Sequence, residues 1–119
     1  MGKPSAYHSQ GYNCAEAMIK SYNEEHNTNI SISLGSGMGN GLTIGSLCGA
    51  VNAAIMIIGY VKGRDDKSKE NEARKYSREL MTRVREKYSS EICLDLKKNK
   101  VGCGEIINFT YDELKEILK

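Results

Sequence analysis

The chain has 119 residues, of which 39% are hydrophobic and 27% charged, and this composition is typical of a globular protein with a core of its own. We expect residues 1–119 to form a single domain. The net charge of +2 is too small to indicate nucleic acid or an anionic membrane surface as a partner, and the sequence has no basic cluster interleaved with aromatic residues.

The N-terminal stretch MGKPSAYHSQGYN has no apolar run of the kind found in secretory signals. The segment from Leu42 to Val61 is the one candidate for a membrane span. It contains three glycines and polar residues such as Asn52, and its length is at the lower limit for a spanning helix. We therefore expect no membrane insertion and a cytoplasmic location, where cysteines remain thiols or metal ligands.

Asn13 and Glu16 have the spacing of a capping box, which predicts a helix from about Cys14 to His26. The later ISISL pattern alternates and by itself is typical of a strand. The run GSGMGNG has four glycines at alternate positions, which predicts a turn. This run lacks the glycine spacing of dinucleotide-binding loops and the lysine of phosphate-binding loops, so neither kind of nucleotide site is expected.

A central helix is predicted from about Leu47 to Lys62, with Ser46 before it and Gly63 after it. No Asp, Glu, Lys or Arg occurs from residue 27 to residue 61. A helix that is apolar on every side needs cover on every side, so we expect this one to be buried by its neighbours.

The C-terminal half has the pattern of three more helices. A long amphipathic helix is predicted from about Asp66 to Tyr88, and a short one around Cys93 follows a serine cap. Thr110 and Glu113 form another capping box, which predicts that the last helix begins there. The expected fold is all-α, a small helical bundle with a buried central helix. The apolar seam expected on the long helix is Ala73, Tyr76, Leu80, Val84 and Tyr88.

The chain has four cysteines, Cys14, Cys48, Cys93 and Cys103, and no C-x-x-C pair. Cys14, Cys48 and Cys93 lie near predicted helix starts, and Cys103 precedes the run GEII, which could open a helical turn. At such positions free amide hydrogens and the helix dipole favour a thiolate. A thiolate is the form that binds a metal or attacks a disulfide. We therefore expect one shared four-cysteine site, although each cysteine alone could be a small buried core residue. His8 lies in a polar stretch, which favours a surface role, and an outer role near Cys14 stays open.

These residues resemble the C-GCAxxG-C-C family of redox-active proteins. GYNCAEA around Cys14 and CGAVNAAIMIIG from Cys48 are similar to the two N-terminal motifs of the family, and Cys93 and Cys103 match its last two cysteines. The sequence departs from the motif at Ala53, which stands where the family has glycine. The resemblance implies a small helical domain, a redox role, four cysteines that hold an iron–sulfur cluster or another metal, and a helix near residues 30–34 instead of the strand.

Three classes of function stay open from the sequence. The leading hypothesis is a redox protein with an iron–sulfur cluster used in electron transfer, and zinc is the alternative metal because four thiolates suit both. The second is a metal-free thiol–disulfide oxidoreductase, with a low-pKa Cys48 and Cys14 as the reactive pair. The third is a non-enzymatic module with cysteines that only pack. The sequence identifies neither the electron-transfer partner nor the oligomeric state, and a homodimer stays open.

Overall fold

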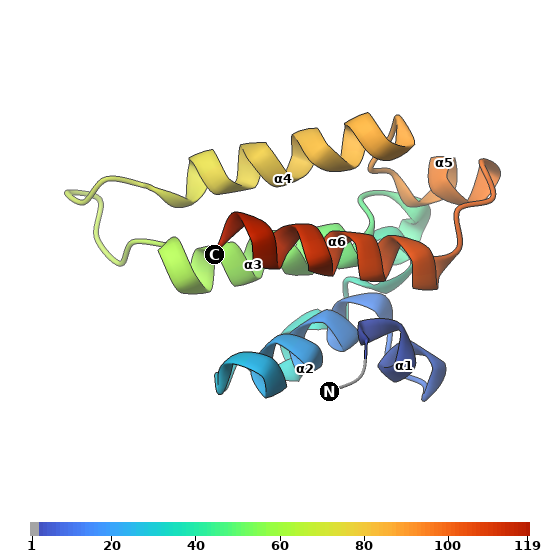
Figure 1. Cartoon of the computed structure of the whole chain (residues 1–119), viewed down its shortest axis with the longest axis horizontal. Coiled ribbons are helices and arrows are strands. Elements are labelled where there is room, and N and C mark those ends of the chain that lie inside the picture. Colours follow the sequence, from blue (N-terminus) through green and yellow to red (C-terminus); the bar gives the residue numbers. More distant parts are fainter. Residues whose placement is uncertain (1–2) are drawn as a thin grey trace.

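The computed structural model describes residues 3–119 and is all-α, as predicted. An isolated antiparallel bridge between Leu47 and Ile92 is the one β-type pairing in this part of the chain. Figure 1 shows the arrangement of the helices. They are α1 (Pro4–Ser9), α2 (Cys14–His26), the 3₁₀ helix η1 (Ile32–Gly35), the π-type turn η2 (Gly41–Gly45), α3 (Gly49–Lys62), α4 (Ala73–Tyr88), α5 (Cys93–Lys98) and α6 (Cys103–Ile117).

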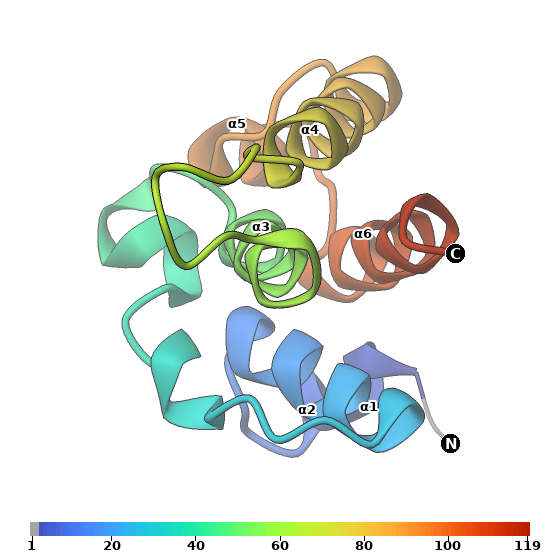
Figure 2. The same ribbon diagram turned by 90° about the vertical axis from the view of Figure 1, so that its left-hand side faces the viewer.

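The uncharged helix α3 lies at the centre of the bundle, surrounded by α2, α4 and α6 (Figure 2). Its side chains from Ala50 to Ile58 include six that are fully buried, which confirms the predicted central helix. The last turn differs from the prediction, because Tyr60 and Val61 are 55% and 40% exposed. In the described part of the chain, no helix combines the length and apolar character that a membrane crossing needs.

Helices α2, α3 and α6 begin at the same end of the bundle, on the right in Figure 1, and α5 lies at that end too. Helix α4 runs the opposite way and returns the chain to this end. Helix dipoles place partial positive charge at each N-terminus. The fold therefore gathers several positive helix ends in one region.

The start of α2 lies where its capping box predicts. The Glu16 N–H donates to the Asn13 side-chain oxygen at 2.8 Å, and the Asn13 N–H donates to the Glu16 carboxylate at 2.9 Å. The helix ends at His26, and Asn27 follows in the left-handed conformation with φ 54°. Both bounds agree with the predicted helix.

Helix α4 begins at Ala73, seven residues later than predicted. The reason lies at Asp66, whose carboxylate accepts from the Ser68 N–H at 3.1 Å and from the Ser68 hydroxyl, closing a turn in place of a helix start. The segment between Asp66 and the start of α4 is rich in charged residues and has no apolar face to bury. The predicted seam is confirmed, because Leu80, Val84 and Tyr88 are buried and the two residues before them pack against the core.

The predicted start of the last helix at Thr110 is wrong. Helix α6 begins at Cys103, and Thr110 is fully buried in its interior. Ile106, Ile107 and Leu114 are buried together on one face, and only a helix that starts near Cys103 gives them that common face. This burial outweighs the local capping preference of the threonine.

Two short segments complete the fold. The 3₁₀ helix η1 occupies Ile32–Gly35, so the helix implied by the family resemblance is right in kind and the alternation in ISISL does not form a strand. Helix α1, which the sequence analysis did not predict, begins with Pro4 at its first position, where a missing N–H carries no penalty. It packs against α2 and α6 and carries His8.

Candidate four-cysteine site

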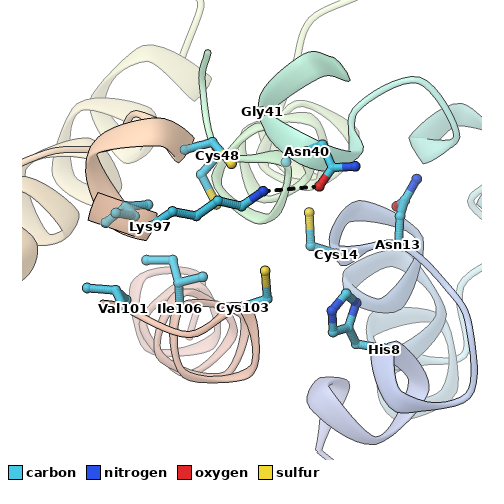
Figure 3. Close-up of a pocket in the computed structure, with 13 residues that line it drawn as sticks. His8, Asn13, Cys14, Asn40, Gly41, Cys48, Lys97, Val101, Cys103 and Ile106 are labelled. Carbon is cyan, nitrogen blue, oxygen red and sulfur yellow. Dashed lines mark hydrogen bonds between the residues drawn. The ribbon is translucent and has the colours of Figure 1, made fainter. Parts of the chain in front are cut away.

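All four cysteines lie at the starts of helices, as the sequence predicts. Cys14, Cys93 and Cys103 are the first residues of α2, α5 and α6, and Cys48 is the N-cap of α3. Together they line one cavity of about 130 Å³, here called the four-cysteine cavity. Figure 3 shows Cys14, Cys48 and Cys103 around it. Chain segments separated by up to 89 positions in sequence (14 to 103) therefore meet in one place.

The four thiols differ in exposure. Cys14 and Cys48 are 8% and 5% exposed, Cys93 is half-buried and Cys103 is exposed. The cavity thus has a buried floor with two sulfurs and an open side at Cys103. The rest of its lining is His8, Asn13, Asn40, Gly41, Gly49, Leu96, Lys97, Val101 and Ile106.

An antiparallel bridge holds Cys48 and Cys93 side by side. The Cys48 N–H donates to the Glu91 carbonyl at 2.9 Å, and the Cys93 N–H donates to the Ser46 carbonyl at 2.6 Å. Arg85 anchors this bridge to the end of α4, because its guanidinium donates to both Glu91 carboxylate oxygens at 2.7 and 2.8 Å. The positions of two cysteines therefore depend on a contact from a third helix.

The glycine-rich run is fixed over the start of α2, beside Cys14. The Asn13 amide donates to the carbonyls of Gly35 and Ser36 at 3.1 and 3.2 Å. The Ser36 hydroxyl donates to the Glu16 carboxylate at 2.8 Å. The two residues of the capping box thus also set the path of the loop that follows over the cavity.

The loop then enters a left-handed turn that forms part of the cavity wall. Four successive residues have positive φ, at 53°, 63°, 56° and 77° for Asn40, Gly41, Leu42 and Thr43. Left-handed backbone is unfavourable for residues with a Cβ, and runs of it are rare. Gly41 makes the turn compatible with Cys93, since a Cβ at this glycine would collide with the Cβ of Cys93.

Burial sets the pKa of the two inner thiols. It raises the pKa of Cys48 from 9.0 to about 11, and the backbone amides of Val51 and Ala50 offset only part of this rise. Burial also raises the pKa of Cys14, and the nearby Cys103 thiol adds to the effect. The expectation of a low-pKa Cys48 is therefore wrong: the helix start is present, but the desolvation of the sulfur outweighs it.

His8 lines the cavity. The sequence analysis left open whether this histidine lies near Cys14. Its Nδ1 lies 3.0 Å from the Tyr12 carbonyl oxygen, and since a carbonyl oxygen only accepts, Nδ1 is the donor in this hydrogen bond. Figure 3 shows the ring on the side of Cys14 and Cys103. Helix α1, which was not predicted, brings this ring to the site.

Lys97 is a second lining residue that the sequence analysis missed. Its side chain reaches from α5 to Asn40, where Nζ lies 3.4 Å from the amide oxygen (Figure 3). Positions four apart lie on one face of a helix, so its spacing from Cys93 in the predicted short helix was the available signal.

The four thiols surround the cavity without meeting at one point. Within residues 3–119, no group of three or more His, Cys, Asp or Glu side chains has the arrangement that would hold a single metal ion. The donor set is nevertheless the one that soft metals and iron–sulfur clusters take. A group that occupied the whole cavity would have four thiols around it.

The fold and the cavity define a small helical bundle in which four cysteines from the starts of helices line one cavity. The chain belongs to the family described as "Putative redox-active protein (C_GCAxxG_C_C)", which it matches over residues 12–117. No curated protein and no solved structure matches the chain.

Proposed function

We propose that the chain is a redox protein whose four cysteines hold one iron–sulfur cluster used in electron transfer. The observation that carries this proposal is that thiols from the starts of four helices line one cavity. Four cysteine ligands are the usual set for [2Fe–2S] and [4Fe–4S] clusters. The family description, which is redox activity, agrees with this use.

The spread of the thiols favours a cluster over a single zinc ion. Zinc needs its sulfur ligands at about 2.3 Å from one point. In residues 3–119 no such convergence exists, whereas thiols around a cavity of about 130 Å³ leave space for several atoms between them. Zinc is the alternative occupant, and elemental analysis separates the two.

The chain itself supplies ligands, orientation and partial exclusion of water. Leu96 and Ile106 are buried and give the cavity an apolar wall. The amides of Ala50 and Val51 favour the thiolate form of Cys48 and so offset part of the charge that a ligating sulfur carries. When bound, an iron–sulfur cluster supplies one-electron oxidation and reduction.

The test is elemental analysis and visible absorption of protein purified without oxygen. The expected result is iron and acid-labile sulfide in equal amounts, with a visible band that each Cys→Ser variant weakens or removes. Val101→Ala, which changes the cavity wall without removing a donor, should retain the iron. A colourless protein with stoichiometric zinc would overturn the cluster and support the zinc alternative. Metal-free protein would overturn both metal proposals.

A metal-free thiol–disulfide centre is the second candidate, and the exposure of Cys103 favours it. An exposed thiol can meet a dissolved disulfide, and Cys14, which lines the same cavity, is the thiol that would act on the resulting mixed disulfide. In this form the reactive thiol is Cys103 and not the buried Cys48. Oxidation of metal-free protein should then yield a Cys14–Cys103 disulfide on peptide mapping, and a random mixture of pairings would contradict it.

We infer a cytoplasmic site of action, because free thiols and thiol-ligated metals persist in reducing compartments.

A further inference from the structure

The four-cysteine cavity has a mouth with an unbalanced positive charge. Three of its lining residues, Asn40, Lys97 and Cys103, are solvent-exposed, whereas the sulfurs of Cys14 and Cys48 lie on the buried floor. The exposed residues therefore mark where a dissolved molecule enters. One of these exposed residues is a lysine, Lys97, and no Asp or Glu of the described residues 3–119 lines the cavity.

Within residues 3–119, the ammonium group of Lys97 has no carboxylate as an ion-pair partner. Its neighbour is the Asn40 amide oxygen at 3.4 Å, a long hydrogen bond to an uncharged group. On the same helix, the Asp95 carboxylate accepts from the Ser90 hydroxyl at 2.8 Å. A lysine in this position attracts anions to the mouth.

We propose that Lys97 makes the mouth of the four-cysteine cavity selective for small anionic disulfides, such as those that carry carboxylates, which react at Cys103. The proposal rests on the metal-free thiol–disulfide candidate, in which Cys103 is a free thiol, because a Cys103 sulfur that ligates a cluster does not attack a disulfide. It adds the charge class of the small molecule that reaches this site and the residue that selects it. Because Lys97 acts on the approaching molecule and not on the sulfur, it is a selectivity residue.

The reaction is thiol–disulfide exchange. The Cys103 thiolate, having lost its proton to solvent, attacks one sulfur of the disulfide. A new S–S bond joins Cys103 to half of the molecule, the original S–S bond breaks, and the other half leaves as a thiolate that takes up a proton. The Cys103 sulfur is oxidised and the released half is reduced, so the small disulfide is the oxidant.

The test compares two disulfides of nearly equal size on the reduced chain. Dithiodiglycolate carries two carboxylates, and its diamide is uncharged. The rate of mixed-disulfide formation at Cys103 is measured by peptide mass spectrometry for each reagent, and the ratio of the two rate constants reports charge selectivity. Lys97→Gln removes the charge at the mouth, and Lys98→Gln is the matched control, since Lys98 lies next to it and does not line the cavity.

We expect Lys97→Gln to lower the ratio of charged to uncharged reagent about three- to tenfold, the size of effect that one nearby charge has at a protein surface. Lys98→Gln should change it less than about twofold, and added salt should lower it in the unmodified chain. An unchanged ratio in Lys97→Gln, or an equal fall in both variants, would overturn the proposal.

The same preparations distinguish failure of this inference from failure of the proposed function. Iron, sulfide and zinc are measured on each protein as purified, before reduction and removal of any bound group. Metal-free protein with a Lys97-dependent ratio would overturn the cluster and support the anion-selective mouth. Protein that holds a cluster and has a ratio that does not depend on Lys97 would support the cluster and overturn the anion-selective mouth.

Discussion

Because Gly49 has no side chain, it leaves room for the Cys14 sulfur beside Cys48. It follows Cys48 at the start of α3, and a Cβ at this position would lie 2.5 Å from the Cys14 sulfur and against the Met38 carbonyl. Real Cβ atoms do not approach other atoms so closely. The glycine of the CGA motif therefore makes room for the sulfur of a different motif, and the two motifs depend on each other.

Gly49→Ala should destabilise the chain by about 1–3 kcal/mol, as overpacking does, and should displace the Cys14 sulfur. Urea unfolding measures the stability, and iron content measures the effect on the site. Gly59→Ala is the control in the same helix, because a Cβ there meets nothing within 4 Å. This control should be neutral or more stable by up to about 1 kcal/mol, since alanine favours helix. Equal stabilities of the two variants would mean that Gly49 is not a close contact.

The cysteine positions were predictable from sequence and their ionisation was not. Cap residues and glycines are local signals, and they located the starts of helices at or beside Cys14 and Cys48. The pKa of Cys48 depends on burial, which is set by segments distant in sequence. For the same reason the sequence analysis did not place His8 or Lys97 at the cavity. Each residue lies on a short helix whose position is fixed by packing.

At the scale of elements, the ion pair of Arg85 and Glu91 connects α4 to the bridge that holds Cys48 and Cys93. The hydrogen bond from Arg85 is the main reason that the pKa of Glu91 lies below its ordinary value of 4.5. A lowered carboxyl pKa stabilises the folded chain above the unfolded pKa, and this contribution is lost as the pH falls through the folded pKa.

Glu91→Gln should therefore reduce stability at neutral pH, and its difference from the unmodified chain should shrink as the pH falls below about 4.5. Urea unfolding at several pH values measures this difference. Glu79→Gln is the control, because the Glu79 side chain, which pairs with Arg83, is 52% exposed, against 13% for Glu91. A difference that stays constant from pH 7 to the acid range would show that the carboxylate charge of Glu91 does not act through Arg85.

Ala53 tests how closely α3 is covered. It is fully buried and stands where the family motif has glycine. Ala53→Leu should overpack the core and destabilise the chain by about 1–3 kcal/mol. Ala6→Leu, on the exposed side of α1, should have little effect in the same unfolding experiment. A neutral result at Ala53 would contradict close packing of this face.

Element boundaries show where local signals lose to packing. The capping box at Asn13 works because Gly11, with a positive φ of 115°, separates α1 from α2, so no helix extends across the box. The similar box at Thr110 fails because Ile106 and Ile107 before it belong to the same buried face as Leu114. The predicted start of α4 at Asp66 is too early, because the charged residues after Asp66 have no apolar face to bury. Helix existence was predictable from periodicity, and helix ends required the tertiary contacts.

At the scale of the whole molecule, the first residues of α2, α5 and α6 and the N-cap of α3 line the four-cysteine cavity. The positive ends of these helices would repel one another if nothing negative lay between them. Neutral thiols leave this repulsion in place, whereas thiolates bound to a metal group balance it. A group bound by all four cysteines would also link four helices, so its binding free energy would stabilise the whole fold.

Removal of the bound group should therefore lower the melting temperature of the entire chain and not only loosen one loop. A group bound at one hundred times its Kd contributes about 2.7 kcal/mol, which corresponds to about 10 °C in Tm for a domain of this size. Thermal unfolding followed by circular dichroism, before and after anaerobic treatment with a chelator and an oxidant, measures the shift. Cys14→Ser, which lacks one ligand, should melt at the same temperature with and without the treatment. If treatment strips the iron and the Tm of the unmodified chain does not fall, the bound group does not hold the four helix starts together.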